Sequence, residues 1–362
     1  MKRVLFIINS LGLGGAERVV VSLANQMAKE GNKVYIIYFK NQCMFEVDSK
    51  VKTICLYSSL SKNPFNIIRN KMSLEKIIKS LEEEGCFDLI TAHLFYSHLI
   101  CRLSIYSNRV NYVMHSMYSK MFNKNKFYLT LFNFMYKSRN LICVSQGLRN
   151  EFIKYWKIDE AKSILVINNP IDIDYIMKKA NEEVPLKDKY IVSAGRLTKI
   201  KQFDVLIIAY LLSSLKKDYK LLIIGEGEDR ERLEEIIHRF NGENYVFLRG
   251  YEKNPYKWIK NAAAYVCTSS YECFPLAFLE SLCCNTPVVS FNCDYGPREI
   301  LRGELKKYLV KNHHIDDLIE TIERAVLEPH EIPEEYFMNY DVEKIVELYF
   351  KVQEITRQVG DK

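Results

Sequence analysis

The chain has 362 residues, of which 48% are hydrophobic and 27% are charged, and its formal net charge is +6 at pH 7. This length exceeds one ordinary hydrophobic core, so it predicts two domains of similar size. The composition excludes a disordered or low-complexity protein, and no uncharged apolar run reaches the roughly 18 residues that a membrane span requires.

Apolar strands alternate with helical patterns through the first half of the chain. Strands are predicted at 2–9, 33–39, 88–92, 111–115, 140–144 and 163–167, and helices at 15–30, 72–84 and 147–156. The first strand runs into a glycine turn without a small-residue cleavage site, so we do not interpret it as a signal peptide. The ten cysteines include no C-x-x-C pair. They therefore indicate core thiols of a reduced, cytoplasmic protein rather than metal ligands.

The second half repeats this alternation. Strands are predicted at 190–194, 220–224, 245–248, 264–267 and 287–291, with a helix near 201–216 and further helices between the strands. The polar stretch from 167 to 188 is predicted to join the halves, and a last helix is predicted at roughly 341–358. The pattern is typical of α/β domains with doubly wound parallel sheets. Such sheets bind ligands at the carboxyl ends of their strands, so we expect the site in a cleft between two facing domains.

Three glycines, Gly12, Gly14 and Gly15, follow the first predicted strand and open a helix. The run is not G-x-G-x-x-G, because its sixth position is Glu17, and this argues against a dinucleotide site. Glycines at this place allow the backbone to approach a bulky ligand, with helix N–H groups facing it. An ordinary tight turn between strand and helix is the alternative interpretation.

Two cations and two carboxylates stand out in the second half. Arg196 and Lys201 follow a predicted strand, and a guanidinium and an ammonium both suit a diphosphate. Glu272 and Glu280 lie eight positions apart, which places them at a loop-to-helix junction and roughly two turns into an apolar helix. Their carboxylates can accept hydrogen bonds from sugar hydroxyls, beside a helix N-terminus that favours phosphate. Taken alone, the same residues are also consistent with solvated cations and a favourable helix-dipole partner.

The segment that holds these glutamates, 268–291, resembles the E-x7-E signature of the family 4 retaining glycosyltransferases, which have the GT-B fold. Six further segments match this family in the expected order: INSLGLGGAERVVVSLA (8–24), ICVSQGLRNEF (142–152), INNPIDID (167–174), SAGRLTKIKQFDVLIIA (193–209), LLIIGEGEDRERLEE (221–235) and FNCDYGPREIL (291–301). The resemblance covers nearly the whole chain. Two positions depart from it, because Cys273 and Asn285 stand where the family usually has glycine.

The resemblance implies two Rossmann-like domains that face each other across a cleft. It implies an acceptor-binding domain at 1–170, a nucleotide-sugar-binding domain at 171–340 and a C-terminal helix at 341–362 that crosses back to the first domain. It also implies a UDP-linked N-acetylhexosamine or hexose as the donor, without a cofactor or a metal ion. The implied donor-binding residues are Gly14, Gly15, Arg196, Lys201, Glu272, Cys273, Phe274, Leu276 and Glu280. The implied acceptor-binding residues are Gly12, Glu17 and His93.

The catalytic residues implied by the resemblance are His115, Glu272, Arg196 and Lys201. The two cations would stabilise the departing diphosphate, Glu272 would face the donor sugar, and Glu280 would bind the ribose hydroxyls. His115 ends a predicted strand and matches the family histidine that stabilises an oxocarbenium-like state; a structural histidine is the alternative. The first domain offers no obvious carboxylate nucleophile. The resemblance implies front-face displacement with retention of configuration.

The segment 117–139 interleaves five Lys or Arg with seven Phe or Tyr. It lies in a basic half, since 1–170 carries a net charge of +12 whereas 171–362 carries −6. Between Asp88 and Glu151 there are eight Lys or Arg and no acidic residue. Such a segment suits an anionic membrane surface, and it also suits single-stranded nucleic acid, which we do not favour, or a partly buried helix.

We therefore expect a metal-independent, retaining hexosyltransferase that acts on a lipid-linked or membrane-associated glycan in surface polysaccharide biosynthesis, such as O-antigen, lipopolysaccharide or capsule. We expect it in the cytoplasm, bound peripherally to the inner face of the plasma membrane through 117–139, with no nucleic-acid partner. Two alternatives stay open: another GT-B enzyme, such as a nucleotide-sugar epimerase, and a non-catalytic scaffold that binds nucleotide sugars. The joint presence of Arg196, Lys201 and both glutamates argues against the scaffold.

Overall fold

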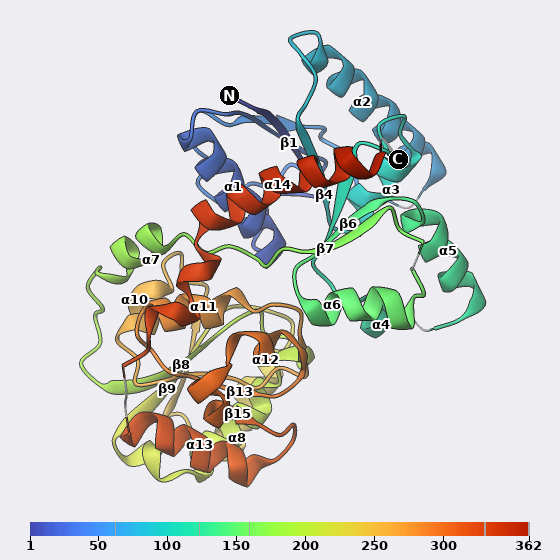
Figure 1. The fold of residues 1–362 in the computed structure, drawn as a ribbon. Coiled ribbons are helices and arrows are strands. Elements are labelled where there is room, and N and C mark those ends of the chain that lie inside the picture. The colour runs from blue at the N-terminus through green and yellow to red at the C-terminus, as the bar shows by residue number, and fades with distance from the viewer. Residues whose placement is uncertain (62, 123, 159, 329–330, 361–362) are drawn as a thin grey trace. The chain divides into compact units, whose positions relative to one another are not determined.

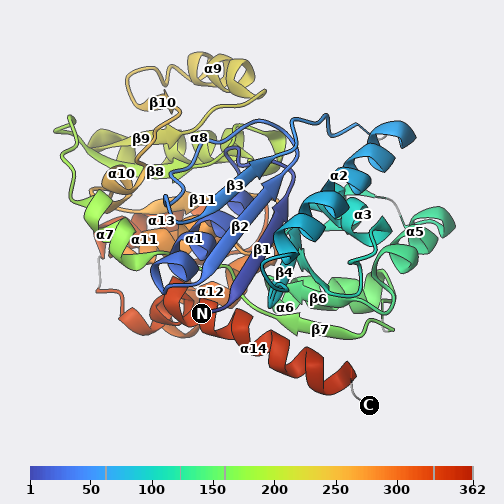
Figure 2. The same cartoon turned by 90° about the horizontal axis from the view of Figure 1, so that it is seen from above.

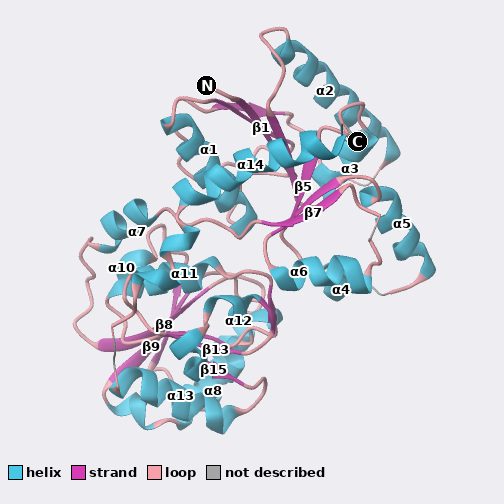
Figure 3. Ribbon diagram, in the orientation of Figure 1, coloured by secondary structure: helices cyan, strands magenta, loops and turns pink. Residues whose placement is uncertain are grey.

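The computed structural model describes residues 1–61, 63–122, 124–158, 160–328 and 331–360. The chain forms two compact units (Figure 1): unit 1 consists of Met1–Pro170 with Val342–Lys362, and unit 2 consists of Ile171–Asp341. Each unit is a parallel sheet covered by helices (Figure 3), which confirms the α/β class that the alternating pattern predicts. The last two residues of the predicted C-terminal helix, 361–362, lie outside the described residues.

Unit 1 contains a seven-stranded parallel sheet with the order β3-β2-β1-β4-β5-β6-β7. Its strands are β1 (Arg3–Ile8), β2 (Lys33–Tyr38), β3 (Lys52–Cys55), β4 (Leu89–His93), β5 (Val110–Met114), β6 (Asn140–Cys143) and β7 (Ser163–Val166). Every residue of β1, β4 and β5 is buried, because strands in the middle of a parallel sheet are covered on both faces. Such strands are mostly apolar, and the sequence pattern predicted all three.

Helices cover both faces of this sheet. On one face, α1 (Gly15–Lys29) packs against α14 (Val342–Gly360). The chain moves from β1 to β3 in one direction along the sheet and from β3 to β7 in the opposite direction. Because connections between parallel strands are right-handed, the helices between β3 and β7 lie on the other face (Figure 2). These helices are α2 (Pro64–Glu82), α3 (Phe95–Leu103), α4 (Tyr118–Met121), α5 (Lys126–Tyr136) and α6 (Gln146–Asn150), which continues as a π-helical turn at Glu151–Tyr155.

Polar side chains cap the starts of three of these helices, α2, α5 and α6, the last through the Ser145 hydroxyl, which accepts from the Leu148 N–H at 3.2 Å. The Asn63 side chain accepts a hydrogen bond from the Phe65 N–H at 3.0 Å, and Pro64 occupies the first helical position of α2. The predicted helix at 72–84 therefore started too late. The Asn125 side chain caps α5 in the same way.

Unit 2 contains a six-stranded parallel sheet with the order β10-β9-β8-β11-β13-β15, beside a ladder of β12 and β14. Its strands are β8 (Lys189–Ala194), β9 (Tyr219–Ile224), β10 (Val246–Gly250), β11 (Tyr265–Cys267), β12 (Tyr271–Glu272), β13 (Val288–Phe291), β14 (Asp294–Tyr295) and β15 (Leu309–Val310). Its helices are α7 (Ile173–Ala180), α8 (Phe203–Leu212), α9 (Arg230–Arg239), α10 (Tyr256–Lys260), α11 (Leu276–Cys283), α12 (Gly296–Ile300) and α13 (Ile315–Leu327). Helix α7 packs on α10 and α11, whereas α13 packs on α8.

Several elements differ from the sequence-based predictions, among them the short strands β12, β14 and β15, which were not predicted. Helix α7 occupies part of the stretch that we predicted as a joint, and the Asp172 side chain caps it by accepting a hydrogen bond from the Tyr175 N–H at 2.9 Å. Strand β3 and helix α3 were not predicted. Among the described residues, no helix has both the length and the apolar character that crossing a bilayer requires.

Candidate active site

Loops at the carboxyl ends of four strands of unit 2 carry the sequence motifs of the second half. They follow β9, β8, β11 and β13, which are neighbours in the sheet in that order. Because parallel strands end at the same edge, the loops 225–227, 195–197, 268–272 and 292–296 come to one edge of unit 2. This is the edge at which open α/β sheets bind ligands.

Two of these loops touch backbone to backbone. The Leu197 N–H donates to the Glu226 carbonyl oxygen at 3.0 Å. A Cβ atom on Gly225, whose φ is +142°, would lie 1.9 Å from the Gly195 carbonyl oxygen, and one on Gly227 would lie 2.2 Å from that of Leu197. Only glycine fits at both places. The contact between 195–197 and 225–227, here called the glycine seam, therefore fixes the backbone that carries Arg196.

Arg196 projects from the glycine seam as an exposed side chain. Within the described part of the chain its guanidinium forms no ion pair. The five N–H donors of an arginine in this position are available to a ligand, and they match a phosphate in a bidentate geometry. The predicted role of Arg196 at the diphosphate stays a proposal.

Lys201 and Glu272 form an ion pair at this edge, with 2.5 Å between Nζ and Oε1. The Ser269 hydroxyl donates to the same Oε1 at 2.8 Å. The two charged side chains are only 28% and 15% exposed. Burial disfavours the ammonium, but the opposite charge of Glu272 outweighs it, so the pKa of Lys201 lies above its ordinary value. Lys201 is therefore a positive charge that stays protonated and oriented.

The chain around Lys201 is held by its neighbours. Lys201 ends a 3-10 turn, Lys199–Lys201, and the following Gln202 has a left-handed conformation. The Thr268 hydroxyl donates to the carbonyl oxygens of Lys201 and Gln202 at 3.0 and 2.9 Å. The loop after β11 thus fixes both the side chain and the backbone of Lys201.

Glu280 lies on α11 and is 4% exposed. The Tyr256 hydroxyl donates to its Oε1 at 3.5 Å. Helix α11 begins at Leu276, so Glu280 is its fifth residue rather than roughly two turns into it, as the sequence predicted. Glu272 is also placed differently, because it belongs to strand β12 and pairs with Tyr295 of β14 instead of standing at the helix start.

The loop from Cys273 to Pro275 packs on the start of α12. A Cβ atom on Gly296 would lie 2.7 Å from Pro275 Cδ and 2.8 Å from the Cys273 carbonyl oxygen. The side chain of Phe274 is buried, and its ring lies 5.4 Å from that of Tyr340. If Cys273, Phe274 and Leu276 bind the donor as predicted, they do so from a backbone that this packing holds in place.

Asn285, one of the two departures from the family pattern, follows α11 with a φ of +59°. Asparagine and glycine are the residues that adopt this left-handed conformation most readily. The Asn285 side chain also accepts a hydrogen bond from the Ile332 N–H at 3.0 Å. Asparagine therefore satisfies the same backbone requirement as the usual glycine.

In unit 1, the candidate residues also lie at the carboxyl ends of strands. Gly12, Gly14 and Gly15 follow β1, with Gly14 as the N-cap of α1. A Cβ atom on Gly14 would lie 2.1 Å from a carboxylate oxygen of Glu17, whereas Gly15 has open space around it. Gly15 therefore offers exposed backbone for a ligand to approach, and the Glu17 carboxylate covers Gly14.

Two histidines meet one strand further along the same edge. His93 ends β4, and His115 follows β5, which pairs with β4. Their rings stack at 5.2 Å, and His93 Nδ1 lies 2.9 Å from His115 Nε2. His93 Nε2 lies 3.0 Å from the Thr91 hydroxyl. His93 is fully buried, with both of its ring nitrogens engaged by Thr91 and His115, and His115 is the partly exposed member of the pair.

Both histidines are neutral near pH 7. Burial lowers the pKa of His115 to about 3, and the charge of nearby His98 adds to the effect. Burial, followed by the charge of His115, holds the pKa of His93 well below its ordinary value. A neutral His115 can donate or accept a hydrogen bond through Nδ1, the ring nitrogen that His93 does not engage.

Sequence reasoning missed several partners of the candidate residues. They are Thr91, Ser269 and Tyr256, which bond His93, Glu272 and Glu280, and the glycines of the seam, Gly225 and Gly227. Only the glycines left a signal in the sequence, as a G-x-G run after a strand. No group of three or more His, Cys, Asp or Glu side chains suited to a metal ion occurs among the residues that the structure describes.

The segment 117–139 is buried on one side and exposed on the other. Phe132, Met135 and Tyr136 of α5 are buried, and the Phe132 ring stacks on Trp156 at 3.9 Å. Met121 and Phe127 are exposed, the latter by 68%. The sequence left two interpretations open. The buried face of the segment agrees with a partly buried helix, and the exposed face agrees with a docking surface. Asn123 lies outside the described residues.

Comparisons with known proteins agree with this geometry. Residues 13–175 match the family model described as Glycosyltransferase Family 4, and residues 175–340 match that of Glycosyl transferases group 1. One relative, the N-acetylgalactosamine-N,N'-diacetylbacillosaminyl-diphospho-undecaprenol 4-alpha-N-acetylgalactosaminyltransferase of Campylobacter jejuni, is 29% identical over 350 residues, which are 93% of each chain.

Solved structures share the fold of the whole chain. A glycosyltransferase from Rickettsia africae superposes with a TM-score of 0.77 at 20% identity, covering 99% of this chain and 98% of that chain. The HepE protein of Anabaena, solved in complex with UDP and glucose, superposes with a TM-score of 0.69 at 17% identity, covering 100% of this chain and 99% of that one. These likenesses identify the two-sheet architecture as the GT-B fold.

Proposed function

The chain belongs to the family 4 glycosyltransferases of the GT-B fold, and on that premise we propose that it transfers a sugar from a UDP-sugar to a lipid-linked glycan with retention of configuration. The donor sugar is an N-acetylhexosamine or a hexose. The observation that carries this proposal is the edge of unit 2, where a fixed ammonium, an exposed guanidinium and two shielded carboxylates gather. These are the groups that a nucleoside diphosphate joined to a sugar requires.

The reaction breaks the bond between the anomeric carbon and the diphosphate oxygen. Arg196 and Lys201 stabilise the negative charge that grows on the departing diphosphate, so no metal ion is needed. Glu272 keeps the Lys201 ammonium in place and faces the sugar hydroxyls. Glu280 accepts hydrogen bonds from the ribose hydroxyls.

The new bond forms on the face from which the diphosphate leaves. The acceptor hydroxyl attacks the anomeric carbon, and its proton passes to an oxygen of the departing diphosphate. The neutral imidazole of His115 binds the donor sugar through Nδ1, and His93 positions it through the 2.9 Å contact with Nε2. Gly12 and Glu17 lie at the neighbouring strand end and contact the acceptor.

A membrane-bound acceptor agrees with three features. The relative from Campylobacter jejuni is named for an acceptor on diphospho-undecaprenol, a lipid carrier. The stretch between Asp88 and Glu151 has eight Lys or Arg and no acidic residue. Within it, α4 and α5 expose apolar side chains beside cations. We propose that the protein works in the cytoplasm, bound peripherally to the membrane through 117–139.

The deciding experiment measures nucleoside diphosphate release from a panel of nucleotide sugars, with and without a lipid-linked glycan acceptor. We expect one or two UDP-sugars to give release that the acceptor stimulates. NMR of the product should show the anomeric configuration of the donor, and a chelator should leave the rate unchanged. Conversion to an isomeric nucleotide sugar without release would indicate an epimerase. Tight donor binding without release under any condition would indicate a non-catalytic scaffold.

A further inference from the structure

A cationic pocket lies on unit 1, where the C-terminal ends of α3 and α5 meet the start of β6. Its volume is about 500 Å³, and its lining includes Arg102, Lys137 and Arg139. Lys137 forms an ion pair with Glu160. The pocket, here called the arginine pocket, thus has three cations and one neutralising carboxylate among its described neighbours.

The two guanidiniums of the arginine pocket have no carboxylate partner among the described residues. Arg102 Nε donates to the Phe134 carbonyl oxygen at 2.6 Å, and an Nη of Arg139 donates to that of Ser138 at 2.8 Å. Both acceptors are neutral, so both positive charges remain uncompensated. Burial, and then the charge of Arg139, lower the pKa of Arg102. The Tyr112 hydroxyl, which also interacts with the Arg139 side chain, is neutral as well. In addition, Arg139 Nε is buried without a hydrogen-bond partner in the described part of the chain.

Two uncompensated positive charges in one pocket repel each other, and a buried donor without a partner costs folding free energy. An anion with several oxygens would relieve both costs, because a guanidinium binds phosphate oxygens bidentately. The orientation of Arg102 is fixed in advance, since its Cζ lies 4.6 Å from the centre of the Phe134 ring. The arginine pocket therefore has the charge and the geometry of a phosphate site.

This pocket is separate from the histidine pair of unit 1. Arg139 directly precedes β6, whereas His115 directly follows β5, which runs parallel to it. The two places lie at opposite ends of neighbouring strands. A strand of five residues is about 16 Å long, so one small ligand cannot bridge them.

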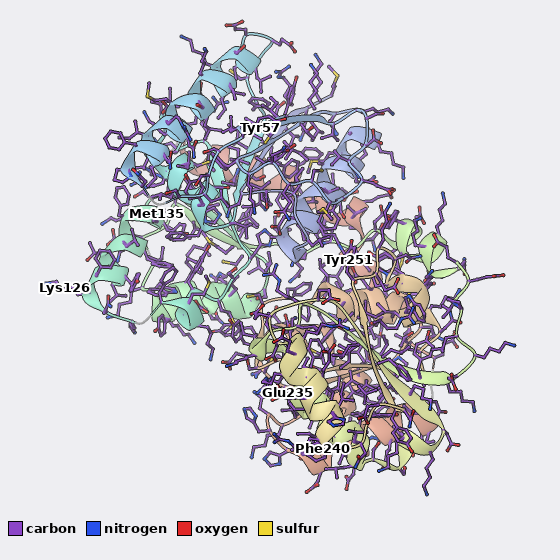
Figure 4. The ribbon with its side chains drawn as sticks, turned by 180° about the vertical axis from the view of Figure 1, so that it is seen from behind. Tyr57, Lys126, Met135, Glu235, Phe240 and Tyr251 are labelled. Carbon is purple, nitrogen blue, oxygen red and sulfur yellow. The ribbon has the colours of Figure 1, made fainter. Side chains whose placement is uncertain are left out.

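Apolar side chains around the arginine pocket indicate where the phosphate comes from. Leu103 and Ile105 follow Arg102 and are exposed, Ile105 by 76%. Phe134 of the pocket and Phe127, nearer the start of α5, are exposed as well. Figure 4 shows Lys126 projecting outward at the start of α5, whereas Met135 near its end is buried. Exposed apolar groups beside cations are typical of a surface that inserts among lipid headgroups.

We propose that the arginine pocket binds the phosphate of an anionic lipid headgroup. The proposal deepens the proposed function and rests on it only for the membrane as the source of the phosphate. The site would anchor unit 1 to the bilayer at a defined point, in addition to the diffuse attraction of the basic surface. Binding at this site would therefore depend on the geometry of the two guanidiniums, whereas general electrostatic binding depends only on the net charge of the surface.

The test measures binding of the full chain to vesicles of phosphatidylcholine with and without phosphatidylglycerol. The double variant Arg102→Lys, Arg139→Lys keeps the net charge but loses both guanidinium forks. We expect it to bind anionic vesicles about tenfold more weakly than the original protein. The double variant Arg102→Gln, Arg139→Gln should bind about 30-fold more weakly, from a loss of about 1 kcal/mol for each cation.

Arg109→Gln is the matched control. Arg109 lies in the same acid-free stretch but pairs with Glu82 at 2.7 Å, outside the pocket. We expect this change to weaken vesicle binding by no more than about fivefold. Unchanged binding of the lysine double variant, or an equal loss from Arg109→Gln, would overturn the pocket and leave only diffuse attraction.

The phosphate group in the pocket could come from a lipid headgroup or from a free phosphate in solution. Titration with inorganic phosphate and with glycerol phosphate separates these two sources. Binding of free phosphate at micromolar concentration, without any preference for anionic vesicles, would overturn the lipid headgroup as the ligand. Melting temperatures within about 3 °C of the original protein show that the variants are folded. The vesicle measurement needs no sugar transfer, so it holds or fails independently of the proposed activity.

Discussion

The Lys201 ammonium lies 2.5 Å from the Glu272 carboxylate, although the two residues are 71 positions apart in the chain. Ser269 donates to the same carboxylate oxygen, and Thr268 holds the backbone of Lys201. The ammonium therefore keeps one orientation before any ligand binds. Such preorganisation lets a charge stabilise a transition state without a reorganisation cost.

We expect Lys201→Ala to lower kcat for sugar transfer by about 100- to 1,000-fold, which is typical for loss of a single charge-stabilising group. The donor KM should change much less, because the charge grows only as the diphosphate departs. The measurement is steady-state nucleoside diphosphate release with the best donor of the panel.

Lys199→Ala is the matched control for that variant. Lys199 belongs to the same 3-10 turn, but its side chain is exposed. We expect a change in kcat of less than about twofold, since an exposed charge is screened by water. Equal losses in the two variants would mean that the turn, rather than the ion-paired ammonium, matters.

Glu280→Gln should weaken UDP binding by about tenfold, because an ionised carboxylate accepts stronger hydrogen bonds from the ribose than an amide does. Isothermal titration calorimetry with UDP measures this directly. Tyr256→Phe removes the hydroxyl that donates to Glu280 at 3.5 Å, and its effect should be smaller, about threefold. A Glu280→Gln protein that binds UDP as tightly as the original would remove Glu280 from the donor site.

His93 should act through His115 and not through the substrate. We expect His93→Leu to lower kcat about tenfold with the donor KM within about twofold, since the loss is one of orientation. His93→Gln, which keeps a hydrogen-bonding group, should recover part of the rate. His98→Gln is the control, because His98 is equally buried but bonds Tyr136 and the Ala92 carbonyl oxygen. It should change stability and leave kcat almost unchanged.

His98 also predicts how the stability of unit 1 depends on pH. It is fully buried, and burial lowers its pKa to about 4, whereas an unfolded histidine has a pKa of about 6.5. The unfolded state therefore takes up the proton first as the pH falls. The stability that neutral His98 contributes is complete above about pH 6.5 and is lost down to about pH 4, at up to about 1.4 kcal/mol per pH unit.

Fluorescence can follow this loss in unit 1 alone. Trp156 is buried in unit 1, and Trp258→Phe would remove the tryptophan of unit 2. In that background, the urea midpoint should fall between pH 6.5 and 4.5, and it should fall less steeply in His98→Gln. Equal slopes in both proteins would assign the pH dependence to other groups.

Asn285 should tolerate glycine better than alanine. Its φ of +59° costs alanine about 1 kcal/mol, and either change loses the bond to the Ile332 N–H. We expect the free energy of unfolding to fall by about 2 kcal/mol for Asn285→Ala and by about half as much for Asn285→Gly. Chemical denaturation measures both, and a smaller loss for alanine would contradict the backbone argument.

Much of the fold could be predicted because the central strands are buried on both faces. Strands β1, β4 and β5 are mostly apolar and fully buried, so their segments stand out from any helical pattern. Strand β3 was missed because it has only four residues, which include Lys52 and Thr53 and are partly or fully exposed. Helix α3 was missed because its N-cap is Leu94, with a φ of +70°, so no polar capping residue marks its start.

The residues of the candidate site could be predicted from the sequence, but their hydrogen-bond and ion-pair partners could not. The resemblance of the motifs to the glycosyltransferase family named Lys201, Glu272 and His115, whereas the local pattern alone left other interpretations open. Their partners depend on which strands become neighbours, and this is decided by the packing of whole sheets. Helix α7 shows the opposite case, since its cap Asp172 was present in the sequence and was overlooked within a polar stretch.

The glycine seam has a consequence for how donor preference can diverge among related enzymes. A side chain at Gly225 or Gly227 would occupy the space of the backbone that carries Arg196. We therefore expect substitutions at these two glycines to be excluded, so that the surface proposed to bind the diphosphate keeps its backbone while other positions change. We expect diversity to enter through the loop from Tyr271 to Pro275, where this chain carries Cys273 at a position that is usually glycine in the family it resembles. A search for altered donors by directed evolution would gain most by randomising that loop and leaving the seam untouched.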